Sequence, residues 1–361
     1  MALLFMDSWD HYDFAALTSK WAFGGGDKTD TSAVGAFGRR STNGFKYRSS
    51  GTVFVGNGHL LEKQLVSSGN TAIVGYAFKC VTPLSDSVNQ SNSESSSTVL
   101  ASIQNFGVTH VWLRLNADGT VSAMYGSTVL ETSLVGVTQN VYTYIEVKVV
   151  IAAALAGSVI VRFNGSEILN VPGVTTQVGA SATWTGVYLK QRNVAGGLNE
   201  WHIDDFYMSD GSGAAPWNDL LGDCRVDAVF PTAEGASSDW TPLTGTNNAA
   251  MVNEAVADGD TSYVTSVTAG HTDTYPVSDT PVVGAAPAGV QICLFVRKES
   301  AGLANLAPVV RHAGMNYPIA VPSPGTSYGI SYAIFQTNPG TDLAWTEADF
   351  NAAEFGFTRM A

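Results

Sequence analysis

Short runs in which apolar and polar residues alternate recur along the chain and predict antiparallel β-strands. In "YTYIEVKVVI" (142–151), every second residue from Thr143 onward is Thr, Ile or Val, whereas the residues between them are mostly Tyr, Glu and Lys. Side chains on a strand point alternately to its two faces. This run therefore predicts a strand with one buried face and one face in water.

Similar runs predict strands over most of the chain, at 71–80, 98–105, 108–115, 119–126, 157–165, 289–298, 306–319 and 328–337. The dipeptides Asp-Gly at 118–119 and Asn-Gly at 164–165 follow such runs and readily supply the positive φ of a tight hairpin turn. Helical periodicity is absent until "WTEADFNAAEFGF" (345–357). There Thr346 can cap a short helix with acids in its first turn, and "EFGFTRM" then predicts a closing strand.

The stretch "MSDGSGAAPWNDLLGD" (208–223) interrupts the strand pattern with small residues and a proline. A chain of 361 residues is also too long for one ordinary core. We therefore expect an all-β protein of two antiparallel β-sandwich (jelly-roll) domains in tandem, with one short helix near the C-terminus. The predicted domains are 1–212 and 223–361, joined by a linker at 213–222.

The segment "VTPLSDSVNQSNSESSS" (81–97) is polar and rich in serine, and predicts a solvated loop. It has two interpretations, an adaptable binding loop or a plain exposed connection, and we favour the plain connection.

Composition excludes several classes of function. The net charge of −13 opposes binding to phosphate backbones, so nucleic acid is not an expected partner. Cys80, Cys224 and Cys293 are too few and too far apart for a disulfide framework or a CxxC zinc site. The N-terminus does not match a secretory signal, and no apolar run has membrane-spanning length. We expect synthesis in the cytosol and no membrane insertion.

Several segments resemble the laminin-G/concanavalin-like jelly rolls of tailed-phage virion proteins. They include "LNADGTVSAMYGSTVLETS", "GSVIVRFNGSEILNV" and "IDDFYMSDG", with "MALLFMDSWDHYDFAALTSKW" at the start and "AWTEADFNAAEFGF" near the end. The resemblance implies a jelly-roll fold in a structural protein of the virion.

Two adjacent acids, Asp204 and Asp205, are the first candidates for chemistry. On a regular strand they would point to opposite faces, Asp205 with Trp201, Ile203 and Tyr207, so they could not flank one glycosidic bond. The Glu-x-Asp-x-Glu triplet of concanavalin-like glycoside hydrolases is absent from the sequence. We expect no catalytic residue and no cofactor, with Asp204 and Asp205 as candidates for a metal site, which would bind calcium.

Four aromatic residues are candidates for stacking on sugar rings: Trp112, Trp184, Tyr188 and Trp201. Each also fits a strand position in a core, and that interpretation is the commoner one.

We expect a non-enzymatic structural component of a tailed-phage virion, associated with tail, baseplate or fibre. It would form a homo-oligomer and assemble with other virion proteins after synthesis in the host cytoplasm. Two alternatives remain: a carbohydrate-binding adhesin that contacts a host surface glycan, and a capsid decoration or collar protein.

Overall fold

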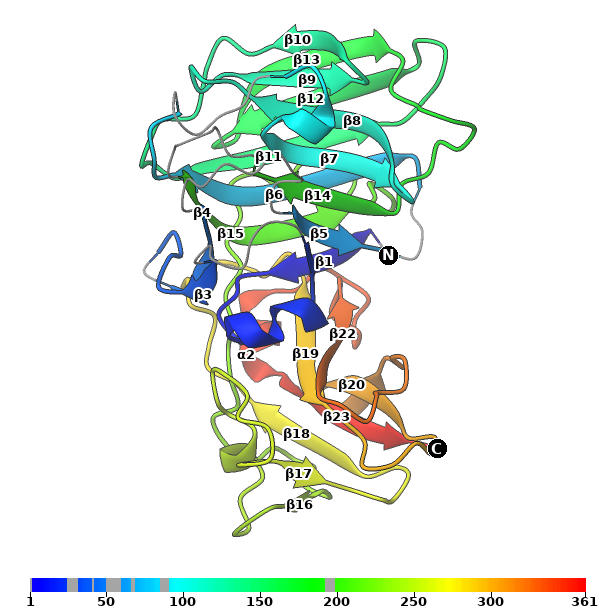
Figure 1. Ribbon diagram of the computed structural model, residues 1–361. Helices are drawn as coiled ribbons and strands as arrows, with labels where there is room; N and C mark the ends of the chain where they lie inside the picture. Colours follow the sequence, from blue (N-terminus) through cyan, green and yellow to red (C-terminus); the bar gives the residue numbers. More distant parts are fainter. Residues whose placement is uncertain are drawn as a thin grey trace. The chain divides into compact units, whose positions relative to one another are not determined.

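The computed structural model (Figure 1) describes residues 2–24, 32–40, 42–49, 60–65, 69–84, 91–191 and 199–361. The chain divides into two compact units, Met1–Val226 (unit 1) and Asp227–Ala361 (unit 2). The predicted linker 213–222 belongs to unit 1 because its side chains pack there: Trp217 and Leu220 are buried. The backbone N–H of Leu221 also donates to the Tyr207 hydroxyl at 3.1 Å.

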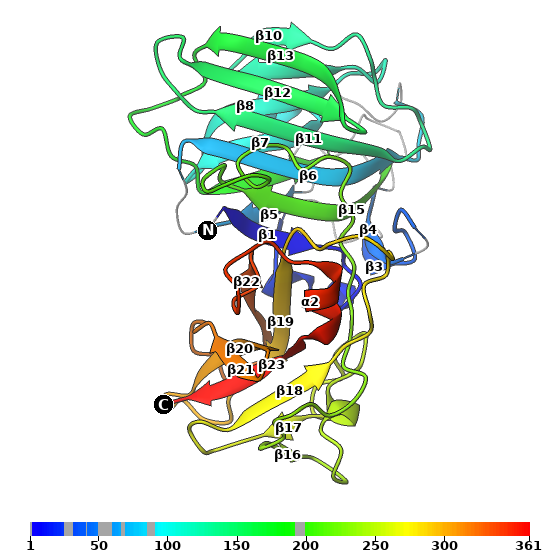
Figure 2. The same cartoon turned by 180° about the vertical axis from the view of Figure 1, so that it is seen from behind.

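Unit 1 is a sandwich of two antiparallel sheets, which Figures 1 and 2 show from opposite sides. In order, the first sheet contains β13 (Ser166–Val174), β12 (Gly157–Phe163), β11 (Thr143–Val150), β6 (Thr71–Cys80), β15 (Asn199–Ser209), β4 (Gly44–Ser49) and β3 (Ala33–Gly35), and β1 (Leu3–Asp7) also pairs with β15. The second sheet contains β10 (Thr128–Thr132), β9 (Val121–Tyr125), β8 (Val108–Leu115), β7 (Val99–Asn105), β14 (Gly186–Lys190), β5 (Leu60–Gln64) and β2 (Ala22–Gly24). Two 3-10 helices, η1 (Phe14–Ser19) and η2 (Glu94–Ser96), lie outside the sheets.

The core of unit 1 lies between the sheets. Ile145, Val147 and Val149 of β11 are buried there, as their alternation predicts. Tyr76 of β6 crosses the core and donates a hydrogen bond of 2.6 Å from its hydroxyl to the carbonyl of Leu100 on β7.

The opposite face of β11 was expected to lie in water, but it is covered by protein. Tyr144 and Glu146 are fully buried on that side. The segment 217–226 covers them: the backbone N–H of Gly222 donates to Glu146 at 2.8 Å. The Tyr207 hydroxyl donates to the same carboxylate oxygen at 2.7 Å. Local alternation could not predict this covering, because the covering residues lie some seventy positions later in the chain.

Unit 2 is also built almost entirely from strands. They are β16 (Thr241–Pro242), β17 (Val264–Thr265), β18 (Thr272–Pro276), β19 (Val290–Val296), β20 (Asn305–His312), β21 (Met315–Pro318), β22 (Gly329–Phe335) and β23 (Glu354–Met360), with η3 (Ala249–Met251) and α2 (Glu347–Ala352). The sheets have the orders β18-β23-β20-β21, β19-β22 and β16-β17. The predicted run 306–319 is two strands, since Ala313 and Gly314 both take positive φ and turn the chain.

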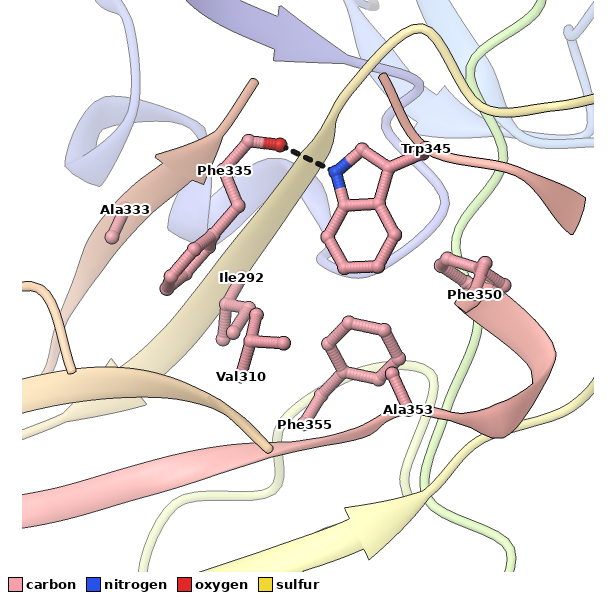
Figure 3. Packing of buried hydrophobic residues seen from close by; sticks show 8 residues of the cluster. All are labelled: Ile292, Val310, Ala333, Phe335, Trp345, Phe350, Ala353 and Phe355. Atoms are coloured by element: carbon pink, nitrogen blue, oxygen red, sulfur yellow. Dashed lines mark hydrogen bonds between the residues drawn. The ribbon is translucent and has the colours of Figure 1, made fainter. Parts of the chain in front are cut away.

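Trp345 and Phe355 lie in the main core of unit 2 (Figure 3). The indole N–H of Trp345 donates to the carbonyl of Phe335 at 2.9 Å, which satisfies its one polar atom inside the core. The helix α2 begins as predicted: the Thr346 hydroxyl accepts from the Asp349 N–H in a capping box. The predicted all-β, antiparallel fold with a short helix near the C-terminus is confirmed.

Candidate functional site

The outer face of the second sheet of unit 1 carries a row of four aligned side chains. Tyr188 on β14 pairs with Ser102 on β7, which pairs with Trp112 on β8, which pairs with Met124 on β9. Residues paired in this way point to the same face. Trp112, Met124 and Val99 form a small apolar cluster, and Tyr188 packs against it.

The next row on this face carries two cations. Lys190 pairs with Val99, which pairs with Arg114, which pairs with Ser122. Leu100 is an extra residue on β7 at this point, which keeps Val99 and Ser102 on one face although they are three positions apart.

The end of the serine-rich segment, residues 91–97, lies on these two rows. The carboxylate of Glu94 accepts from the Ser102 hydroxyl at 2.5 Å and from the Tyr188 hydroxyl. Lys190 donates from Nζ to the carbonyl of Ser95 at 2.9 Å. The segment is therefore no plain connection here, because its groups contact the polar side chains of the face. Residues 85–90 of the predicted loop lie outside the described residues.

Arg114 reaches the same segment from the far side of the rows. Its guanidinium donates to the side-chain oxygen of Asn92 at 2.5 Å and to that of Asn116 at 2.9 Å. A further contact of 3.3 Å joins it to the Ser122 hydroxyl. Neutral oxygens hold this charge, and burial lowers the pKa of Arg114.

Burial also governs the charge state of Glu94. Removal from water raises the pKa of its carboxyl, and bonds from Ser102 and Thr109 and the charge of Lys190 oppose that rise only in part. A carboxyl with a raised pKa is a stronger base than an exposed one. We call Glu94, Ser102, Arg114, Tyr188 and Lys190 the Tyr188 cluster. It combines a basic carboxylate, a phenol that donates a hydrogen bond to that carboxylate, and two cations that can bind an anion.

The aromatic candidates are placed differently from one another. Trp112, Trp184 and Trp201 are 1%, 0% and 2% exposed, so their rings are covered by protein. The indole N–H groups of Trp112 and Trp184 donate to the carbonyls of Gly126 and Thr71. Tyr188 is half-buried and belongs to the cluster described above.

Asp204 and Asp205 lie at a β-bulge in β15. Ile203 and Asp204 pair with Phe78 and Ala77, but the next pair is Tyr207 with Gly75, so two residues of β15 face one of β6. Asp205 is one of the two and takes a left-handed φ of 51°.

The bulge shifts the alternation by one residue. Phe206 follows Trp201 and Ile203 into the core, where its ring lies 4.8 Å from that of Trp21. Tyr207 points outward, over Gly75 and towards Glu146. The predicted faces are therefore wrong beyond Asp204, because the extra residue reverses them.

The two carboxylates bind different partners. Asp204 accepts from the backbone N–H groups of Arg39 at 2.7 Å and Asp205 at 2.8 Å. Asp205 pairs with the guanidinium groups of Arg39 and Arg40, each at 2.9 Å, and accepts from the N–H of Val226 at 2.8 Å. These contacts hold the segment that ends unit 1 against the sheet.

This arrangement does not suit the calcium that Asp204 and Asp205 could have bound, because arginines already neutralise Asp205. Within the described ranges, no group of three or more His, Cys, Asp or Glu residues could hold a metal ion. In the same part of the chain, no helix has the length and apolar character needed to cross a membrane.

The residues predicted from the sequence do not include Glu94, Ser102, Arg114 and Lys190. A partial signal exists, since Tyr188 and Lys190, like Trp112 and Arg114, are two positions apart and share a strand face. Nothing in the sequence indicates that β14, β7 and β8 are neighbours, or that the segment 91–97 lies on them.

No protein-family model matches the sequence, and no curated protein matches it. Solved structures with a similar fold include an endo-β-1,4-glucuronan lyase from Trichoderma reesei, at 11% identity and a TM-score of 0.41, over 52% of this chain and 90% of the lyase. An alginate lyase from Aplysia kurodai matches at 12% identity and a TM-score of 0.40, over 52% and 89% of the two chains. The cellulose-induced protein Cip1 matches at 14% identity and a TM-score of 0.39, over 54% and 92%.

Two of these neighbours are named as lyases, one for glucuronan and one for alginate. This finding contradicts the prediction of a non-enzymatic structural component of a virion. The non-enzymatic part of that prediction depended on the absence of an acidic triplet along one strand. The Tyr188 cluster is assembled across three strands and a covering segment. At these identities and TM-scores, the likeness assigns no role to any residue of this chain. The virion setting itself stays a prediction.

Proposed function

We propose that unit 1 is a lyase that cleaves an acidic, uronate-containing polysaccharide at the Tyr188 cluster. The observation that carries this proposal is the direct hydrogen bond between the Tyr188 hydroxyl and the Glu94 carboxylate, with Arg114 and Lys190 in the adjoining row. These are the group types that an elimination beside a carboxylate requires.

The reaction removes a proton from the sugar carbon next to the carboxylate and breaks the bond from the neighbouring carbon to the glycosidic oxygen. A carbon–carbon double bond forms, and the leaving oxygen takes up a proton without consumption of water. Arg114 and Lys190 would bind the uronate carboxylate and stabilise the charge that develops on it.

Glu94 and Tyr188 would carry the proton around a closed cycle. Glu94, whose pKa is raised by burial, accepts the proton from carbon. Tyr188 donates its own proton to the leaving oxygen, and Glu94 then returns a proton to Tyr188 through their hydrogen bond. The cycle ends with both groups in their starting states.

Substrate must exchange contacts with the covering segment. Lys190 donates a hydrogen bond to the carbonyl oxygen of Ser95, and Arg114 donates one to the side-chain oxygen of Asn92. Both contacts are to neutral oxygens, so a uronate carboxylate would replace them with stronger, charge-assisted bonds.

The test is an assay of the full chain on glucuronan and alginate, with the unsaturated sugar ends detected by ultraviolet absorbance. We expect Tyr188→Phe to lower kcat by about 100-fold or more, the usual effect of losing a proton-transfer group. The matched control is Tyr125→Phe on the same sheet, whose hydroxyl donates to the carbonyl of Gln177 at 3.0 Å and which should keep its activity. Absence of unsaturated ends from either polymer, or full activity of Tyr188→Phe, would refute the proposal.

A further inference from the structure

A second arrangement of cations lies on the outer face of the first sheet of unit 1. Lys46 on β4 pairs directly with His202 on β15, and His202 pairs directly with Lys79 on β6. Three basic residues thus share one row across three adjacent strands, with neighbouring strands about 4.8 Å apart. We call these residues the Lys46–His202–Lys79 row.

An aromatic ring contacts each lysine of the row. Nζ of Lys46 lies 4.4 Å from the ring centroid of Phe37, and Nζ of Lys79 lies 4.7 Å from that of Tyr142. The Phe37 ring is also 5.1 Å from the His202 ring. A ring at this distance favours the charged amine and fixes its position, while the amine keeps donors for another partner.

The two lysines differ from others in unit 1 in what balances their charge. Lys20 pairs with Asp7 at 3.0 Å, and Lys148 pairs with Asp219 at 2.9 Å. Among the residues that the structure describes, neither Lys46 nor Lys79 has a carboxylate within ion-pair distance. The chain has 31 acidic residues against 18 basic ones, so carboxylates are not scarce.

His202 adds a buried polar atom that has no partner among the described residues. Its side chain is 9% exposed, and Nε2 lies 2.8 Å from Glu200, which also lies 3.6 Å from Arg48. Nδ1 is buried without a hydrogen bond. Burial lowers the pKa of His202; the charges of Lys79 and Lys46 act in the same direction, and Glu200 opposes them.

Two lysines in one row, on either side of His202, disfavour each other's charge and that of a protonated His202. A local cost of this kind often marks a functional site, because a bound ligand can offset it. We propose that the Lys46–His202–Lys79 row is an oxyanion-binding site for a carboxylate or sulfate group. The anion accepts from the two amines, and His202 takes up a proton on Nδ1 while Nε2 donates to Glu200. Anion binding is therefore coupled to proton uptake.

The test follows the imidazole C–H resonance of His202 by NMR during a pH titration of the full chain, with His202→Gln to assign it. Sodium sulfate is the first probe, and sodium chloride holds the ionic strength constant. We expect sulfate to raise the pKa of His202 in a saturable manner. Lys46→Gln/Lys79→Gln should weaken sulfate binding about tenfold or more, since charged hydrogen bonds are the strong ones. The control Lys148→Gln, an ion-paired lysine of the same sheet, should leave it unchanged.

A second titration with alginate oligosaccharides distinguishes the source of the oxyanion. If alginate oligosaccharides saturate the site at a concentration at least about tenfold below that needed with sulfate, the natural oxyanion is a polymer carboxylate. If sulfate saturates it at the lower concentration, the oxyanion is a free anion. Both results support the site. The proposal is overturned if sulfate leaves the His202 titration unchanged, or if the double variant responds like the unmodified protein. The single Lys→Gln variants give the same comparison if the double variant does not fold. Because the readout is His202 and not turnover, the result is independent of the proposed lyase activity.

Discussion

The carboxyl of Asp204 makes the stability of unit 1 depend on pH in a direction opposite to that of most carboxylates. Burial, with the charge of Asp205 acting in the same direction, raises the pKa of Asp204 to about 7. In an unfolded chain the pKa of an aspartate carboxyl is about 3.9. The folded protein therefore holds the proton more tightly. The contribution of Asp204 to the free energy of unfolding is fully present below the unfolded pKa and is lost as pH rises through about 7.

The magnitude follows from the pH interval that the group titrates. Each pH unit between the two pKa values is worth about 1.36 kcal/mol, so unit 1 should lose about 3 kcal/mol between about pH 5 and about pH 8. Asp204→Asn removes this titration. Both oxygens of Asp204 accept backbone N–H bonds, and an amide can replace only one of them. The variant should therefore be less stable than the unmodified protein by about 1–3 kcal/mol at the lower pH. It should equal or exceed that protein at the higher pH.

The measurement is urea denaturation followed by tryptophan fluorescence at both pH values. Six of the eight tryptophans lie in unit 1, which makes the signal report mainly on that unit. The control is Asp118→Asn in the exposed turn between β8 and β9, where bonds from Thr120 lower the pKa of Asp118. Its contribution is lost as pH falls, so this variant should gain nothing at high pH. A stability difference between Asp204→Asn and the unmodified protein that stays constant with pH would refute the reasoning.

Three further outcomes are expected. Glu94→Gln should lower kcat on a polyuronate by about 100-fold or more. The activity of the unmodified protein should rise with pH through the raised pKa of Glu94, because only the ionised carboxylate is a base. A flat pH profile would contradict this role. In unit 2, the carboxylate of the buried Asp273 accepts from the backbone N–H groups of Asp239 and Trp240, from the side-chain amide of Asn248 and from the Tyr275 hydroxyl. Asp273→Ala should therefore cost about 3 kcal/mol in thermal or urea unfolding, whereas the exposed Asp260→Ala should leave the midpoint unchanged. Gly75→Ala should destabilise unit 1 by about 1–3 kcal/mol, because its Cβ would lie 2.1 Å from the ring of Tyr207; unchanged calorimetric melting would show that the ring moves freely.

The strands were predictable because alternation is a local property. The runs 71–80 and 108–115 match β6 and β8 residue for residue, and "EFGFTRM" matches β23. The cap at Thr346 was equally predictable, since the donor and acceptor of a capping box are three residues apart.

The candidate site was not predictable, because it depends on which strands are neighbours. Tyr188 could be selected only as an aromatic residue for stacking, and its importance here comes from a carboxylate 94 positions earlier in the chain. Sheet order and register decide such contacts, and neither is encoded in a window of ten residues. For the same reason, the row of Lys46, His202 and Lys79 cannot be recognised before β4, β15 and β6 are placed side by side.

The extra residue in β15 has a consequence for how this chain can vary. Deletion of Asp205 would restore a regular strand and leave Phe206 and Met208 in the core and Tyr207 outside, because Asp204 and Phe206 would then be neighbours that point to opposite faces. Loss of Asp205 would therefore remove its contacts to Arg39, Arg40 and the N–H of Val226 but exchange no face. Loss of a codon at a regular position in the middle of β15 would instead exchange the two faces of the strand beyond it. We expect insertions and deletions in relatives of this chain to avoid the regular positions of β15 and to collect in the turns and at the bulge.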